Sequence, residues 1–314
     1  LMIRRPPRST LSSSSAASDV YKRQAALLAD SGNDVWAIDT WEEHISAIKS
    51  NGLRVEGASG DRTVSMNATT NASDAGECDL IIVATKASGV AAAAVAAKSI
   101  AGPKSIILTI QNGLGAAERI AESIDTNQVM IGVVGGFGAS IKAPGHAHHN
   151  GMQLVRIGEM IGGVSDRLEK VVSAWDKAGF TAKGYPDIHQ MIWEKFICNV
   201  TYSGPCALMN ATIGQVQANC DSWSVALSCA READAVARAK KINLGFDDVE
   251  SYVRDFGANM PEARPSMLLD HMAQRPSEID GINGAVPVEA EKIGMSAPIN
   301  ALVSGLIRGR EANF

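Results

Sequence analysis

Short apolar runs separated by longer amphipathic stretches fill the first half of the chain. Two of these runs are continuous, 80–85 (LIIVAT) and 105–110 (SIILTI), and shorter ones lie at 35–38 and 129–134. Continuous apolar runs that alternate with helices are typical of parallel strands buried on both faces of a sheet. We therefore expect a doubly wound, Rossmann-like α/β sheet, with helices near 25–31, 41–50, 90–99 and 164–177.

Strand signals end after Pro186, and helical periodicity takes over. The expected helices lie near 188–202, 223–241, 246–256, 266–272, 278–293 and from 298 onward. Ser277 is a typical N-cap for the helix over 278–293, which would place Glu278 in the first turn, where the macrodipole favours a carboxylate. The sequence thus predicts an α/β domain over 25–185 and an all-helical domain over 186–314.

The first 24 residues differ from the rest in composition. They hold five of the 29 basic residues, one of the 34 acidic residues and a run of four serines, and such a segment buries too little surface to order itself. A disordered tail, a transit peptide and foreign sequence are the three explanations. We favour foreign sequence, because the string resembles a translated sequencing-adapter read-through. We expect the first strand and its glycine-rich turn to be missing, since no GxGxxG precedes Ala25.

Composition and charge exclude several classes of protein. With 46% hydrophobic residues, 20% charged residues and a net charge of −5, the chain is an ordinary globular protein and not a nucleic-acid binder. Five cysteines without a CxxC pair argue against a disulfide framework and a structural zinc site, which fits the cytoplasm. No apolar run is long enough to span a membrane. His146, His148 and His149 lie in an expected hairpin tip, so we predict no metal site.

Polar residues stand where three of the predicted strands end. Asp39 follows the strand at 35–38, Lys86 follows LIIVAT, and Asn112 in QNG follows SIILTI. In open α/β sheets ligands bind beyond the carboxyl ends of the strands, so these residues are candidate ligand contacts. Asp39 stands where dinucleotide-binding folds place the acid that binds the ribose 2′-hydroxyl. Alternatively, Asp39 caps the next helix, and Asn112 with Gly113 forms only a turn.

A second set of polar residues shares one face of the helix predicted from 188. Lys195, Asn199 and Ser203 are spaced four apart in WEKFICNVTYS, so they line up along about 12 Å of helix. Apolar residues occupy the remaining faces and would anchor the helix. A solvated lysine at a helix surface is the alternative, because lysine is nearly always exposed.

These segments resemble the ketopantoate reductase (2-dehydropantoate 2-reductase) family from about Ala25 to the end of the chain. The resemblance is carried by QNG at 111–113, by WEKxxxN at 193–199 and by Ser266-x11-Glu278 ahead of IDGINGAV. It implies a Rossmann domain followed by an all-helical substrate and catalytic domain. It also implies an oxidoreductase of pantothenate biosynthesis that reduces a small branched 2-oxo acid by hydride transfer from NAD(P)H.

The resemblance also implies roles for single residues. Lys195 matches the proton donor, and Glu278 matches a catalytic residue near the cofactor ribose. Asn112, Asn199, Ser203 and Ser266 match or replace substrate-binding positions. The implied cofactor contacts are Asp39, Lys86, Asn112, Ala139 and Glu278.

Departures from the family pattern leave three questions open. Ser203 replaces a usual asparagine, so a dehydrogenase of another small 2-hydroxy acid is one alternative. The chain lacks a glycine-rich turn, so a fragment that is unable to bind the cofactor is another. The family suggests NADP(H), whereas Asp39 favours NAD(H), because a carboxylate repels a 2′-phosphate. The long helices also suit a homodimer interface in the helical domain.

Overall fold

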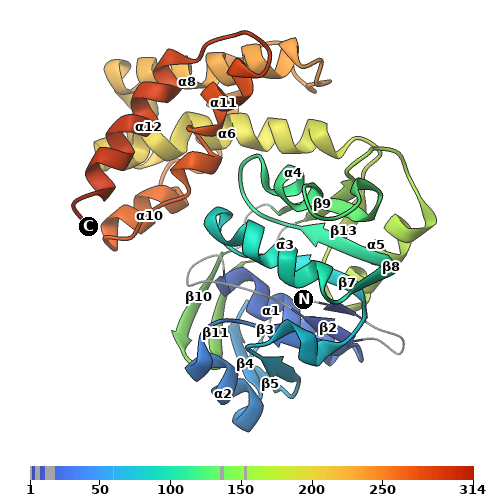
Figure 1. The fold of residues 1–314 in the computed structure, drawn as a ribbon. Coiled ribbons are helices and arrows are strands. Elements are labelled where there is room, and N and C mark those ends of the chain that lie inside the picture. The colour runs from blue at the N-terminus through green and yellow to red at the C-terminus, as the bar shows by residue number, and fades with distance from the viewer. Residues whose placement is uncertain (1, 4–7, 11–17, 59, 135–137, 152–153) are drawn as a thin grey trace. The chain divides into compact units, whose positions relative to one another are not determined.

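The structure is a computed structural model that describes residues 2–3, 8–10, 18–58, 60–134, 138–151 and 154–314 (Figure 1). The chain divides into two compact units, which are described separately. The first unit comprises Leu1–Gln111 and Ala116–Ile188, and the second comprises Asn112–Gly115 and His189–Phe314. Four residues of the loop after the third apolar run therefore belong with the helical part of the chain.

A nine-stranded sheet forms the centre of the first unit, as the apolar runs predict. Its strands follow the order β1-β3-β2-β7-β8-β9-β12-β13, and β6 pairs with β3. The strands are β1 (Met2–Ile3), β2 (Arg8–Thr10), β3 (Asp34–Ile38), β6 (Asn67–Thr69), β7 (Cys78–Val83), β8 (Ala101–Thr109), β9 (Val129–Val134), β12 (Val155–Glu159) and β13 (Ala182–Gly184). The central pairs from β3 to β9 are parallel, whereas β12 runs antiparallel to β9.

The expectation that the first strand is missing is wrong, because β2 fills its place. Ser9 pairs in parallel with Val35 of β3 on one side and with Leu80 of β7 on the other. The ladder between strands consists of backbone hydrogen bonds, so an extended segment with few apolar residues can complete it. Hydrophobic patterning alone does not detect such a strand. The glycine-rich turn would fall within 11–17, which lies outside the described residues.

Helices and a small second sheet complete the first unit. The helices are α1 (Ser18–Asp30), α2 (Glu42–Asn51), α3 (Val90–Lys98), α4 (Ala116–Ala121) and α5 (Asp166–Lys177), with short 3₁₀ turns η1 (Ala72–Ala75), η2 (Ala87–Gly89) and η3 (Thr126–Gln128). The second sheet has the order β10-β11-β4-β5, formed by β10 (Gly138–Ala143), β11 (His146–Gly151), β4 (Leu53–Gly57) and β5 (Arg62–Val64). Ser165 caps α5 by accepting a hydrogen bond from Leu168 N, and Trp175 of α5 is fully buried.

Among the described residues, the second unit consists of helices and the turns and loops that join them, with no strand. Its elements are α6 (Ile188–Met209), α7 (Ile213–Ala218), α8 (Cys220–Ala239), α9 (Val249–Ala258), α10 (Ser266–Met272), η4 (Ile279–Gly281), α11 (Ala285–Glu291) and α12 (Pro298–Glu311). Figure 1 shows α6 as the long yellow helix and α12 as the red helix that leads to the C-terminus. One apolar cluster, which includes Phe196, Ile197 and Val200 of α6, forms the core of this unit.

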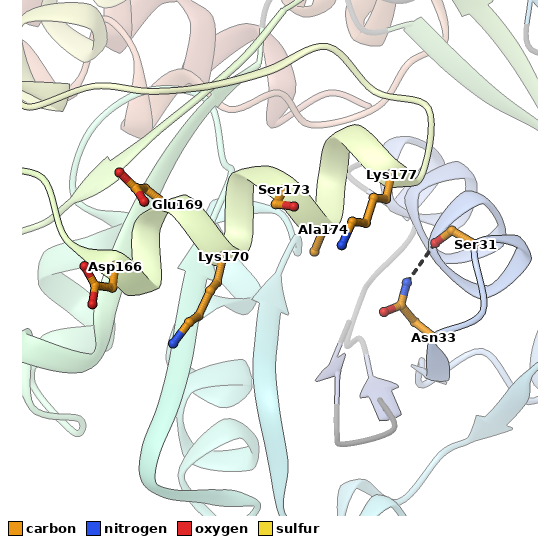
Figure 2. A pocket seen from close by; sticks show the side chains of 8 residues that line it. All are labelled: Ser31, Asn33, Asp166, Glu169, Lys170, Ser173, Ala174 and Lys177. Atoms are coloured by element: carbon orange, nitrogen blue, oxygen red, sulfur yellow. Dashed lines mark hydrogen bonds between the residues drawn. The ribbon is translucent and has the colours of Figure 1, made fainter.

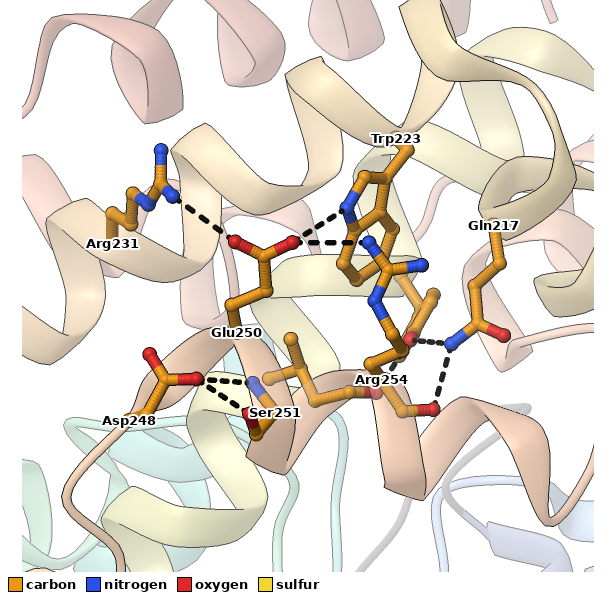
Figure 3. A network of polar contacts seen from close by, with 9 residues as sticks. Gln217, Trp223, Arg231, Asp248, Glu250, Ser251 and Arg254 are labelled. Atoms are coloured by element: carbon orange, nitrogen blue, oxygen red, sulfur yellow. Dashed lines mark hydrogen bonds and ion pairs between the residues drawn. The ribbon is translucent and has the colours of Figure 1, made fainter.

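A polar network ties α9 to α8 at the surface of this unit (Figure 3). The carboxylate of Glu250 accepts hydrogen bonds from Arg231, from Arg254 and from the indole of Trp223. The guanidinium of Arg254 also lies 4.3 Å from the centre of the Trp223 ring. Asp248 caps α9 through the backbone and side chain of Ser251. The network fixes an outer helix and holds none of the predicted site residues.

Helix α6 continues through Pro205, further than its predicted end near 202. Proline lacks an N–H, so the carbonyl of Thr201 loses its usual helical partner. One residue earlier along the helix, the buried amide of Asn283 accepts from Gly204 N and donates to Val200 O, two groups that an α-helix ordinarily pairs with each other. A side chain from the segment after η4 therefore supports the middle of α6.

No helix in the described part of the chain is both long and apolar enough to cross a membrane.

Candidate active site

Lys195 and Asn112 meet in the second unit. The ammonium of Lys195 donates a hydrogen bond to Oδ1 of Asn112 over 2.7 Å, and both side chains are partly buried. Lys195 lies on α6, and Asn112 lies in the loop that follows β8. The amide oxygen is a neutral acceptor, so it orients the ammonium without neutralising its charge. Two residues predicted independently, from a strand end and from a helix face, thus form one polar centre.

The loop of Asn112 packs directly against η4. Leu114 N donates to Gly281 O over 3.0 Å, and Leu114 packs on the apolar cluster of the unit. Gly113 has a φ of +82°, and a Cβ atom built there would lie 1.9 Å from Gly281 O. This position therefore requires glycine for both its conformation and its close approach. Since Glu278 begins the turn that ends at Gly281, the loop brings the Lys195–Asn112 pair and the Glu278 segment into one region.

The predicted helix over 278–293 is wrong in its first part, and so is the predicted N-cap, although α11 (Ala285–Glu291) lies within the predicted range. Glu278 precedes the 3₁₀ turn η4, and the α-helix begins only at Ala285. Ser277 does not cap a helix, because its backbone N and Oγ both donate to Glu311 of α12. The cause is the segment from Gly281 to Gly284, where glycine disfavours a helix and the side chain of Asn283 is drawn to α6.

Asn199 and Ser203 follow Lys195 on α6, four and eight residues later, as the spacing predicts. Asn199 is partly buried, and Ser203 is 4% exposed. The Asn283 bridge to Val200 and Gly204 lies within this stretch of the helix. Sequence reasoning did not find the role of Asn283, although an asparagine followed by glycine inside a predicted helix was the available signal.

Ser266 is the first residue of α10 and is exposed. The far end of α10 carries His271, whose side chain contacts the same Glu311 that binds Ser277. Ser266 and Glu278 are thus the ends of one segment held by α12. The resemblance to the family had grouped them only by their spacing.

Asp39 and Lys86 lie in the first unit, beyond the carboxyl ends of two parallel strands. Asp39 follows β3, is 2% exposed, and accepts a hydrogen bond from Trp41 N over 3.0 Å through Oδ1. Lys86 follows β7 and precedes η2. Strand β2 lies between β3 and β7, so the chain order reverses there, and such a switch point is where open α/β sheets bind their ligands. Asp39 thus places a buried carboxylate at the carboxyl end of β3, beside this switch point.

Ala139 lies in β10, where it pairs in register with His149. This strand belongs to the four-stranded sheet, so the backbone of Ala139 is not at a strand end of the nine-stranded sheet. A histidine and carboxylate group lies on the same small sheet, where His146 and His148 both contact Glu56. Across the described ranges, no group of three or more His, Cys, Asp or Glu side chains is arranged to hold a metal ion.

A shallow hollow of about 530 Å³ lies beside α5 and the end of α1 (Figure 2). Ser31 and Asn33, which precede β3, line one side, and Lys170 and Lys177 of α5 line another. Asp166 and Glu169 balance these two lysines. Because the hollow lies at the amino end of β3, opposite the end where such sheets bind ligands, it is not the candidate site.

The arrangement around Lys195 suits proton donation to a developing oxyanion. An ammonium held by a neutral acceptor and partly removed from water is a strong electrophilic donor to a carbonyl oxygen. The polar side chains that continue along α6 offer hydrogen bonds to a small polar substrate. The described residues therefore favour chemistry at a carbonyl or hydroxyl group.

Comparisons with known proteins agree with this chemistry. The family model described as ketopantoate reductase PanE/ApbA matches residues 22–162, and the model of its C-terminal part matches residues 187–311. A 2-dehydropantoate 2-reductase of Streptococcus pyogenes is 32% identical over 286 residues, covering 91% of this chain and 92% of the relative.

Solved structures show the same fold. A PanE/ApbA family ketopantoate reductase from Ralstonia eutropha superposes with a TM-score of 0.87 at 25% identity, covering 98% of this chain and 99% of the other. A D-mandelate dehydrogenase in complex with NADH and anilino(oxo)acetate has a TM-score of 0.86 at 24% identity, covering 97% and 99%. The latter likeness concerns the fold.

Proposed function

The chain belongs to the ketopantoate reductase PanE/ApbA family, and from this membership we propose that it reduces 2-dehydropantoate, or a similar branched 2-oxo acid, to the 2-hydroxy acid. It is an NAD(P)-dependent oxidoreductase that acts on CH–OH groups. The observation that supports the proposal most strongly is the 2.7 Å hydrogen bond between Lys195 Nζ and Asn112 Oδ1. This pair would direct an acidic proton toward a substrate carbonyl.

Lys195 is the proton donor in this proposal. The nicotinamide cofactor, when bound, supplies the hydride that reaches the carbonyl carbon. The Lys195 ammonium polarises the carbonyl oxygen and transfers one proton to it as negative charge develops, which leaves a neutral amine and a 2-hydroxy acid. Asn112 accepts a hydrogen bond from both forms of the lysine, so it keeps Nζ oriented throughout.

The remaining candidate residues bind and orient. Asn199, Ser203 and Ser266 offer neutral hydrogen bonds to the substrate, and Glu278 positions the reacting groups near the cofactor ribose. Asp39 and Lys86 hold the cofactor at the strand ends, with Ala139 as a further contact. Asp39 favours NAD(H) over NADP(H), because its carboxylate would repel a 2′-phosphate.

Turnover with a panel of 2-oxo acids tests this proposal. The purified protein should oxidise NADH or NADPH in the presence of 2-dehydropantoate faster than with unbranched 2-oxo acids. Lys195→Met should lower kcat by about 100-fold or more, since general acid catalysis typically contributes 10²–10⁴. Lys98→Met replaces an exposed lysine of α3 and should leave kcat unchanged.

The substrate panel and the Lys195 variant test different parts of the proposal, namely the identity of the substrate and the identity of the proton donor. Preference for another 2-oxo acid would move the substrate to a different small hydroxy acid while keeping the chemistry. If Lys195→Met retains kcat within tenfold while circular dichroism shows an intact fold, then Lys195 is not the proton donor. Homodimerisation through the helical unit and a cytoplasmic location stay proposals, and light scattering and cell fractionation measure them.

A further inference from the structure

The segment that carries Glu278 is attached to the last helix of the chain. Oε1 of Glu311, the final residue of α12, accepts hydrogen bonds from Ser277 N over 2.9 Å and from Ser277 Oγ over 2.6 Å. Ser277 directly precedes Glu278, so their Cα atoms are separated by about 3.8 Å. The position of the Glu311 carboxylate therefore fixes the peptide from which Glu278 extends.

A histidine from α10 completes this attachment. Nε2 of His271 lies 3.0 Å from the same Glu311 oxygen, and the His271 side chain is fully buried. A carboxylate only accepts hydrogen bonds, so His271 donates through Nε2. Three donors converge on one oxygen at the C-terminal end of α12, where the helix dipole disfavours a negative charge. These donors offset that cost, so the site is built around the carboxylate.

A second contact holds the other side of Glu278. Arg308, one turn before Glu311 on α12, contacts the Asp280 carboxylate over 2.9 Å. This ion pair is exposed and contributes little by itself. Beyond it, Gly281 O accepts from Leu114 N in the loop of Asn112. Glu278 thus lies between an attachment to α12 and an attachment to the Lys195–Asn112 centre.

We propose that Glu311 is a positioning residue, which holds Ser277 and thereby sets where the Glu278 carboxylate lies relative to Lys195. This inference rests on the role proposed for Glu278. Glu311 itself does not touch substrate in this proposal. Glu311 affects catalysis only through Glu278. A residue that only stabilised the fold would affect catalysis whether or not Glu278 were present.

A double-mutant cycle tests this dependence. Glu311→Ala should lower kcat roughly tenfold in the wild-type background and less than about twofold in the Glu278→Ala background, because residues that act through one another are not additive. Glu311→Gln keeps the oxygen that accepts from Ser277 and should restore kcat to within about threefold of wild type. Glu291→Ala removes an exposed acid of α11 as a matched control and should leave kcat unchanged.

The kcat values of the Glu311 and Glu278 variants distinguish failure of the positioning role from failure of the role proposed for Glu278. Equal losses from Glu311→Ala in both backgrounds, or a Gln variant as slow as the Ala variant, would overturn the positioning role. Full activity of Glu278→Ala alone would instead contradict the role that the proposed function gives to Glu278, and would leave the reduction itself standing. If Glu311→Ala does not fold, Glu311→Asp replaces it in the cycle, since it keeps the charge and draws the carboxylate back by one methylene.

Discussion

Lys195 and Asn112 are 83 positions apart in the chain, yet a 2.7 Å hydrogen bond joins the ammonium of one to the amide oxygen of the other. The bond connects helix α6 to the four loop residues that belong to the same compact unit. A flexible lysine side chain loses rotamer freedom when it is held in this way. The charge-assisted hydrogen bond offsets this loss and fixes the position of the ammonium.

Replacement of Asn112 should therefore weaken catalysis. Asn112→Ala removes the acceptor, and a hydrogen bond to a charged group contributes about 1.5–3 kcal/mol. We expect kcat to fall by about 10- to 100-fold, measured from steady-state oxidation of the reduced cofactor. Asn127→Ala, in the exposed η3 turn, is the control. An unchanged kcat would mean that Lys195 keeps its orientation without this partner.

A methyl group at Gly113 should disturb the site more than one at Gly115. The two glycines have similar φ values, +82° and +92°, but a Cβ at Gly113 would lie 1.9 Å from Gly281 O, whereas one at Gly115 would meet nothing within 4 Å. Both alanine variants carry backbone strain of about 1–3 kcal/mol. Only Gly113→Ala should also lower kcat/KM, by tenfold or more in rough terms. Equal kinetics for the two variants would contradict the close packing of the loop on η4.

Cofactor preference should respond to Asp39. Asp39→Asn keeps an oxygen that can accept from Trp41 N and removes the charge. The KM for NADPH should fall by about tenfold while the KM for NADH rises, because repulsion of a 2′-phosphate is relieved and a ribose contact is weakened. Glu42→Gln, an exposed acid in the first turn of α2, should change neither KM value. A protein that already prefers NADPH would show that Asp39 does not select the cofactor.

One thiol should react in the folded protein. Cys220 is exposed, whereas Cys78, Cys198, Cys206 and Cys229 are buried. Burial raises the pKa of Cys198, Cys206 and Cys229 to about 12, which suppresses their thiolates. Titration with a chromogenic disulfide should release one equivalent before unfolding and five afterwards. Cys220→Ser should abolish the reaction of the folded protein.

Stability at acid pH should depend on Glu289. Burial tends to raise the pKa of this carboxyl, but hydrogen bonds from Lys240 and Lys292 outweigh burial and lower the pKa below its usual value of 4.5. A lowered pKa means that the contribution to folding is complete above 4.5 and disappears as the pH falls through the folded-state value. The free energy of unfolding of Glu289→Gln should be lower than that of wild type at neutral pH. The difference between the two proteins should shrink as the pH falls from 4.5 through the lowered pKa of Glu289, as urea titrations at a series of pH values would measure.

The sequence predicts the elements that repeat a simple pattern. The strand at 129–134 and the helix at 266–272 have the boundaries that apolar periodicity indicates. Periodicity does not detect β2, because backbone bonds to both neighbours hold that strand. It wrongly extends a helix over 278–293, where Asn283 instead bridges two backbone groups of α6.

In the candidate site, too, the sequence predicts the residues that follow a local pattern and does not predict the contacts between distant segments. Helical spacing places Lys195, Asn199 and Ser203 correctly on one face of α6. The hydrogen bond from Lys195 to Asn112 and the attachment of Ser277 to Glu311 join segments that are distant in the chain. No local pattern encodes such pairs, because they depend on how loops pack against helices. The catalytic and binding roles themselves stay proposals.

The loop of residues 112–115 makes the two units inseparable by a single cut. The helical unit takes these four residues from the middle of the sequence of the other unit. A gene piece that starts at His189 would lack the acceptor for Lys195, and one that ends at Ile188 would carry a loop without its η4 support. Exchange of one whole unit between relatives by recombination therefore requires three crossovers. Two of them flank residues 112–115, and the third lies near residue 188.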